Sequence, residues 1–289
     1  MSGKLFDRNC EKISAEIAPL VQQEILDQLK EAFPELICIQ IGSVGKKPIT
    51  DYNGDIDIAV KCKDIKTLEQ IINTTFYYLE QVTVESYYIV SIKYPYQIIE
   101  DNHIEEKIRY VQCDFILMWD EDYTKFRYYC PNYINKESNY KVGAKIMFAT
   151  MILNHTFQQT ENIQYKYDFR PTALYKYIYN HKEKTLIEEF VSIKPNEIAN
   201  ICFSDGDVNH FNSVETLWEA IHSNIFKYPN EVKIIEYNWF INCWRKGWTS
   251  IVPENFELQY WTNDEIWKGI HKQDKINRIN QAFQNGMEI

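Results

Sequence analysis

Apolar and polar residues alternate along the first part of the chain with two different periods. Apolar residues at helical spacing predict a helix over residues 10–33, divided into two pieces at Pro19, and a second helix over 65–79. Short β-branched or alternating runs predict strands instead. These runs lie at residues 35–42, 54–62, 82–96 and 108–119, with a candidate fifth strand at 125–130.

The pattern changes after Tyr140. Residues 141–155 have helical spacing, and the segments that follow are mostly helical or ambiguous and rich in Trp and Tyr. We therefore place a domain boundary near residue 135. It separates a first domain of strands and helices at 1–135 from a mainly helical domain at 136–289, which together predict an α+β protein.

The charge balance limits which partners the protein can bind. The chain has 289 residues, 45% of them hydrophobic, and a net charge of −10. Residues 1–135 carry 14 basic and 22 acidic side chains, a net charge of −8, and the remainder carries a net charge of −2. Affinity for nucleic acid comes mainly from Lys and Arg on phosphates, so any polynucleotide must meet a local basic patch. Clustered carboxylates, in contrast, suit magnesium.

Cysteine usage and the N-terminal residues predict a cytoplasmic protein that does not enter a membrane. The seven cysteines are scattered and never form a Cys-x-x-Cys pair, which argues against disulfides and zinc. The first residues are polar, unlike a signal peptide. The sequence has no apolar run of the roughly 18 residues that a transmembrane helix needs.

Three aspartates stand where strands are predicted. Asp55 and Asp57 would point to the same face of one strand, where two carboxylates repel each other unless a cation lies between them or water solvates both. Asp114 lies inside a run at 110–118 that otherwise predicts a core strand, so it needs either a basic partner such as Arg109 or a metal ion. Together, the three could form an oxygen-lined site for two Mg²⁺ or Mn²⁺ ions.

Gly42 and Ser43 follow the first predicted strand. A Gly-Ser turn that leaves a strand and opens a short helix presents backbone N–H groups and a hydroxyl to phosphate oxygens, although the same dipeptide also occurs in ordinary turns. A Walker-type phosphate loop is excluded, because Gln40 stands where its first glycine should be and no Ser or Thr follows Lys46.

The order of these motifs resembles the DNA polymerase β-like nucleotidyltransferase superfamily. Gly42-Ser43 is followed after about a dozen residues by Asp55-Ile56-Asp57, and then by Asp114 in a later strand. The resemblance covers roughly residues 35–120. It implies a palm domain, with a mixed sheet and flanking helices, that transfers a nucleoside monophosphate from an NTP such as ATP and releases pyrophosphate. It also implies that Asp55 and Asp57 hold the nucleotide and its metal, while Asp114 helps to deprotonate the acceptor.

Several basic residues are candidate phosphate ligands. Lys46 follows the Gly-Ser turn, and Lys141 and Lys145 lie one turn apart on a predicted helix; the superfamily commonly directs such a lysine at the triphosphate. Solvated positions are the alternative for all three. Arg245 and Lys246, among aromatic residues, could bind a single strand by charge and stacking.

The acceptor is open at this point. An RNA 3′ end, extended without a template, is the favoured acceptor, and a small molecule such as an aminoglycoside, or a protein side chain, is the alternative. A catalytically silent palm that serves as a binding or structural module is a third interpretation, against which the three intact aspartates argue.

Overall fold

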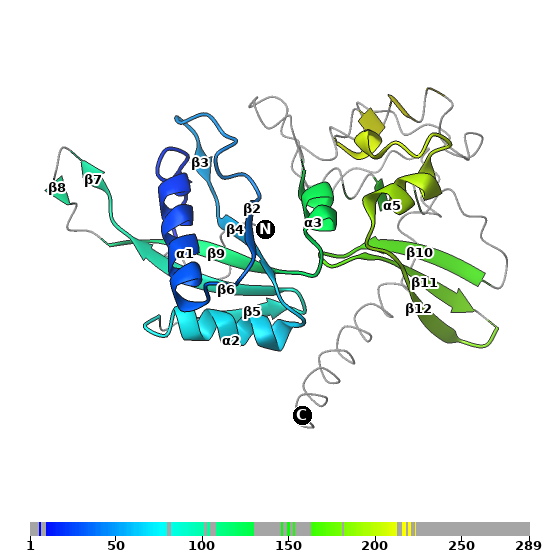
Figure 1. Ribbon diagram of the computed structural model, residues 1–289, viewed down its shortest axis with the longest axis horizontal. Helices are drawn as coiled ribbons and strands as arrows, with labels where there is room; N and C mark the ends of the chain where they lie inside the picture. The colour runs from blue at the N-terminus through cyan, green and yellow to red at the C-terminus, as the bar shows by residue number, and fades with distance from the viewer. Residues whose placement is uncertain are drawn as a thin grey trace, which may run out of the picture.

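A computed structural model describes most of the first 212 residues (Figure 1). The described ranges are 10–79, 82–100, 103–104, 108–129, 163–180 and 182–212, together with isolated positions at 6, 146, 149, 150, 153, 216, 217, 219, 220 and 223. Within this part of the chain, none of the helices is long and apolar enough to cross a bilayer.

A five-stranded mixed sheet forms the centre of the N-terminal half. Its strand order is β2 (Cys38–Ile41), β4 (Ile56–Lys61), β9 (Arg109–Met118), β6 (Ile89–Tyr96) and β5 (Val82–Ser86). β4 and β9 run parallel, whereas the other three neighbouring pairs run antiparallel. β4 and β9 are therefore next to each other in space, although about fifty residues separate them in sequence.

Two helices cover one face of this sheet. α1 (Ala18–Ala32) crosses the strands, and α2 (Ile65–Thr75) lies at one end of α1 and runs along the strands near β5 (Figure 1). Both bury their apolar stripes in one core with alternate residues of β4, β6 and β9. From β4 this core takes Ile56, Ile58 and Val60, so the residues between them point to the opposite face.

The first predicted helix is shorter than expected. α1 begins at Ala18 with Pro19 in its first turn, where the missing N–H costs nothing, so the proline starts the helix rather than dividing it. The preceding residues form the short strand β1 (Ile13–Ser14), which pairs with β3 (Tyr52–Asn53). Through this pairing, β1 fixes the position of β3 in the loop that leads into β4.

Two further expectations about strands need correction. The single strand predicted at 82–96 is two antiparallel strands, β5 and β6, joined by a turn. The candidate strand at 125–130 is instead mostly within the helix α3 (Glu121–Tyr128). The side chain of Asp120 accepts a hydrogen bond from the N–H of Tyr123 at 2.8 Å, and this cap outweighs the β-forming aromatics.

The mainly helical second domain is not confirmed, because its described residues include a second sheet. This antiparallel sheet contains β10 (Ile163–Phe169), β11 (Leu174–Asn180) and β12 (Thr185–Ser192), and α5 (Pro195–Cys202) and the 3₁₀ turn η1 (Val208–Phe211) follow. Tyr, Phe and Ile recur along these strands, and such residues fit a pleated surface. Of the helix expected over 141–155, the described positions are helical. A further small hairpin is formed by β7 (Ile99–Glu100) and β8 (His103–Ile104).

Arg170 stabilises the second sheet and its junction with α3. Its guanidinium binds both carboxylate oxygens of Glu188, at 3.0 and 2.7 Å, and one oxygen of Asp168 at 3.3 Å. The side chain is only 7% exposed. The backbone carbonyl of Arg170 accepts a hydrogen bond from the hydroxyl of Tyr123 in α3 at 3.0 Å. Arg170 therefore has a structural role here, with its donors directed at carboxylates.

Replacing Arg170 with Met should destabilise the protein by about 2–3 kcal/mol, because Glu188 and Asp168 would lose their shared cation. Lys176→Met is the matched control, since Lys176 pairs with Glu189 in the same sheet through a more exposed contact of 3.4 Å and should contribute less than about 1 kcal/mol. Urea denaturation of the three proteins measures the difference. Equal losses in the two variants would contradict the assigned role.

Candidate metal and nucleotide site

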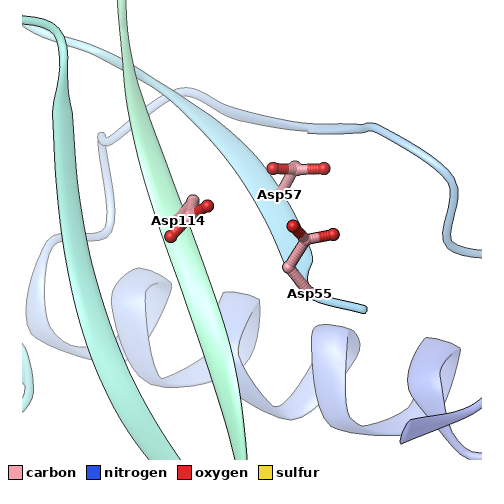
Figure 2. A group of neighbouring side chains, drawn as sticks. All are labelled: Asp55, Asp57 and Asp114. Atoms are coloured by element: carbon pink, nitrogen blue, oxygen red, sulfur yellow. The ribbon is translucent and has the colours of Figure 1, made fainter. Parts of the chain in front are cut away.

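Asp55, Asp57 and Asp114 meet on the sheet face opposite α1 and α2. Asp57 and Asp114 are register partners across the parallel pair β4–β9, and Asp55 lies just before β4 (Figure 2). One carboxylate oxygen of each lies within 4.8 Å of those of the other two. A divalent cation could therefore contact all three, and carboxylate oxygens are ligands that Mg²⁺ and Mn²⁺ prefer.

The core pattern of β4 determines where Asp57 points. Because Ile56 and Ile58 are fully buried against the helices, the side chain between them must face the other side of the sheet. The buried side chain of Gln22 in α1 then donates a hydrogen bond to the carbonyl of Asp57 at 3.0 Å. The helix layer thus fixes the backbone of the site from behind.

Asp114 is held by two polar neighbours on its own sheet face. The hydroxyl of Ser91, its register partner on β6, donates to Oδ1 at 2.7 Å. The amide of Gln112 donates to Oδ1 and Oδ2 at 2.9 and 3.1 Å. Arg109, the basic partner considered from the sequence, lies instead 3.8 Å from a carboxylate oxygen of Glu11. The orientation of Asp114 is therefore set by neutral donors.

Burial and mutual repulsion disfavour the ionised form of these acids. Burial, together with the charges of Asp55 and Glu85, raises the pKa of Asp114 to about 6, although the hydrogen bonds from Ser91 and Gln112 lower it. Burial also raises the pKa of Asp57 well above its usual range, and the charges of Asp55 and Asp114 act in the same direction. A bound cation would remove this repulsion.

Gly42 lets the backbone lie directly against Asp57. Its φ is +76°, and a Cβ atom at this position would overlap Oδ2 of Asp57. Gly45 has a similar φ of +73°, but a Cβ there meets nothing within 4 Å. Of these two glycines, Gly42 is therefore the one required by close contact as well as by backbone conformation.

Ser43 begins a series of turns rather than the short helix expected from the sequence. The N–H of Lys46 bonds the carbonyl of Ser43 at 3.2 Å, as in a turn. The hydroxyl of Ser43 donates to Oδ1 of Asn53 at 2.9 Å. Asn53 is fully buried on β3 and was not singled out from the sequence. It ties the Gly-Ser turn to the loop that leads into Asp55.

The predicted lysines have different outcomes. The charge of Lys46 lowers the pKa of Asp57, so this lysine acts on the acidic cluster. Lys141 and Lys145 lie outside the described residues, as do Arg245 and Lys246. Gln22, Ser91, Gln112 and Asn53 support the site, and only Ser91 and Gln112 carried a sequence signal, as polar residues inside apolar strands.

Comparison with known proteins gives distant structural similarity but no match in sequence. No protein-family model and no curated protein matches this sequence. Among solved structures, polymerase beta of Leishmania infantum in a ternary gap complex is similar with a TM-score of 0.39 and 10% identity. The match covers 57% of this chain and 51% of that chain, so this protein matches about half of that chain's length. Because such a TM-score is too low to establish a shared fold, the observed sheet and its aspartates carry the functional interpretation.

Gly42→Ala should weaken binding of a magnesium–nucleotide complex by tenfold or more, because the added methyl group collides with Asp57. Gly45→Ala is the matched control, since it introduces comparable strain at positive φ without a collision. Calorimetric titration of both variants with ATP and Mg²⁺ measures the effect. Equal affinities in the two variants would remove the case for close approach at Gly42.

The metal-free protein should lose stability as pH rises from about 4 through 6, because the raised pKa values of Asp57 and Asp114 favour folding only while these acids are protonated. Asp57→Asn should therefore raise the Tm by several degrees at pH 8 and leave it nearly unchanged at pH 4. Glu31→Gln, at an exposed position of α1, is the control. Thermal melts in a chelator measure these values, and a Tm difference independent of pH would contradict the assignment.

Proposed function

We propose that this protein is a metal-dependent nucleotidyltransferase. It moves a nucleoside monophosphate from an NTP to an acceptor hydroxyl and releases pyrophosphate. The observation that supports this most strongly is the close grouping of three aspartates around a parallel strand pair, with a glycine backbone packed against one of them. Anionic phosphates approach carboxylates only when cations lie between them, and this site offers both the carboxylates and the close backbone.

In this proposal Asp55, Asp57 and Asp114 hold Mg²⁺ or Mn²⁺. The residues fit such ions, because three carboxylates lie close together in a site where their own charges repel. Cations bound there would neutralise charge that develops on the phosphoryl oxygens and would lower the pKa of the attacking hydroxyl. The triphosphate lies over Gly42 and Ser43, where backbone N–H groups and the charge of Lys46 are near. Lys141 and Lys145 remain candidate ligands of the same group.

Asp114 is the base in this reaction. The acceptor hydroxyl gives its proton to the carboxylate, its oxygen bonds to the α-phosphorus, and the bond to the β-phosphate oxygen breaks as pyrophosphate leaves with the electron pair. A carboxylate beside bound cations would be ionised near neutral pH and could accept this proton. Ser91 and Gln112 keep the carboxylate oriented while its protonation changes.

The proposed acceptor is an RNA 3′ end that is extended without a template. In the proposed organisation, residues 1–135 form the catalytic palm and residues 136–289 form a second domain that reaches the acceptor, with Arg245 and Lys246 as RNA contacts. A small molecule such as an aminoglycoside, or a protein side chain, is the alternative acceptor. Each acceptor would give a different labelled product, so one experiment distinguishes them.

Asp55→Asn and Asp57→Asn should each reduce nucleotidyl transfer about a thousandfold or more without unfolding the protein, since each removes a metal ligand that stabilises charge in the transition state. Asp122→Asn, at an exposed position in the first turn of α3, is the control and should keep near wild-type turnover. The assay incubates each α-labelled NTP with Mg²⁺ or Mn²⁺ and with separate pools of RNA, proteins and aminoglycosides.

Label that moves to RNA supports the proposed acceptor, and label on a protein or an aminoglycoside replaces it with the alternative. Near wild-type turnover in either cluster variant would contradict the metal assignment. Absence of transfer to all three pools, with intact folding, would contradict the proposed activity itself.

A further inference from the structure

A polar strip extends from Asp114 along the same sheet face. On β9, the side chains of Asp114, Gln112 and Tyr110 alternate with residues that pack on the helices, so all three face the metal side. On β6, Ser91 is the register partner of Asp114 and Lys93 is the partner of Gln112. Lys93 therefore lies beside Gln112, two residues along the sheet face from Asp114, the acid that would act on the acceptor.

Tyr110 and Lys93 contact each other in this strip. The Nζ of Lys93 lies 4.3 Å from the centroid of the Tyr110 ring, in a cation–π contact. Lys93 is half-buried, and the charges of both Lys93 and Asp114 act on the pKa of the same thiol, that of Cys10. The ammonium and the carboxylate therefore share one side of the sheet.

The ammonium of Lys93 has no carboxylate within ion-pair distance among the residues that the structure describes, unlike neighbouring Arg109, which is paired with Glu11. An aromatic ring orients the ammonium without neutralising it. A positive charge held in this way next to a site for phosphate chemistry is available to an anion that arrives from outside.

We propose that Lys93 and Tyr110 form a phosphate subsite for the acceptor, so that the attacking hydroxyl belongs to a nucleotide whose own phosphate contacts Lys93. This inference rests on the proposed function and specifies its acceptor. Two residues along a strand span about 7 Å, and a single ribose separates a 3′ hydroxyl from the phosphate on its 5′ side. A hydroxyl at Asp114 would therefore place that phosphate near Lys93.

The charges on the two sides of the acidic cluster agree with two anionic substrates. Lys46 acts on Asp57 at the Gly42 side, where the triphosphate is proposed to lie. Lys93 lies beyond Asp114 and Ser91, on the opposite side. A polycationic aminoglycoside would meet repulsion from Lys93 at this position, whereas an RNA end would meet attraction.

The test compares Lys93→Gln with Lys63→Gln, a control at a lysine whose side chain is 75% exposed and paired with Asp64. Binding of a short 5′-labelled single-stranded RNA is measured by fluorescence anisotropy at several salt concentrations, and binding of ATP with Mg²⁺ is measured separately by calorimetry. Lys93→Gln should weaken RNA binding by several-fold or more and reduce the slope of log Kd against log salt by about 0.7, the effect of one lost phosphate contact to a single strand. Lys93→Arg should largely restore both quantities.

A steady-state arm uses two acceptors, a dinucleotide with its phosphodiester and a nucleoside without one. Lys93→Gln should raise the KM for the dinucleotide and leave the KM values for the nucleoside and for NTP unchanged. An RNA salt slope equal to that of wild type, no RNA binding by the wild type, or equal losses with both acceptors would overturn the subsite. Failure of the wild type to bind ATP with Mg²⁺ would instead contradict the proposed function, so the two failures are distinguishable.

Discussion

The parallel pairing of β4 with β9 is the constraint on which the site depends. In its register Asp57 lies opposite Asp114, while the antiparallel pairs on either side place Ile41 next to Asp57 and Ser91 next to Asp114. A slip of one residue would turn the carboxylate of Asp57 into the core. The fully buried isoleucines on either side of Asp57 prevent that slip, so hydrophobic burial on one face fixes the chemistry on the other.

The same register concentrates negative charge, and the charge of Lys46 opposes the resulting rise in the pKa of Asp57 only in part. Asp57 and Asp114 both have raised pKa values, mainly through burial, and the neighbouring acid Asp55 adds to the effect. The surrounding groups orient these acids more than they compensate for them, because the donors from Ser91 and Gln112 are neutral. Local instability of this kind is expected where a site is shaped for a ligand rather than for the folded chain alone.

The sequence predicted those features that depend on short-range pattern. Alternation over residues 54–62 predicted the strand β4 that carries Asp57, although the strand begins at Ile56 and leaves Asp55 just before it, and Asp114 stood out as an acid inside a predicted core strand. The helix α3 was mistaken for a strand because its aromatics are strand formers, and the cap at Asp120 decided otherwise. The second sheet was missed although the Tyr, Phe and Ile residues of its strands are strand formers. Gln22 and Asn53 could not be found, because their roles arise from contacts across the fold.

Along the strands, the sheet face is apolar on one side of Asp57 and Asp114 and polar on the other. Toward the C-terminal ends of β4 and β9, this face becomes apolar at Ala59 and Ile116 and packs against Tyr128 of α3. Toward the start of β9 it stays polar, through Gln112 to Tyr110. Among the described residues, a charged substrate of the proposed reaction would therefore avoid burial against apolar groups by extending from Asp114 along the polar side. The direction in which an acceptor would leave the site follows from this change in the sheet surface.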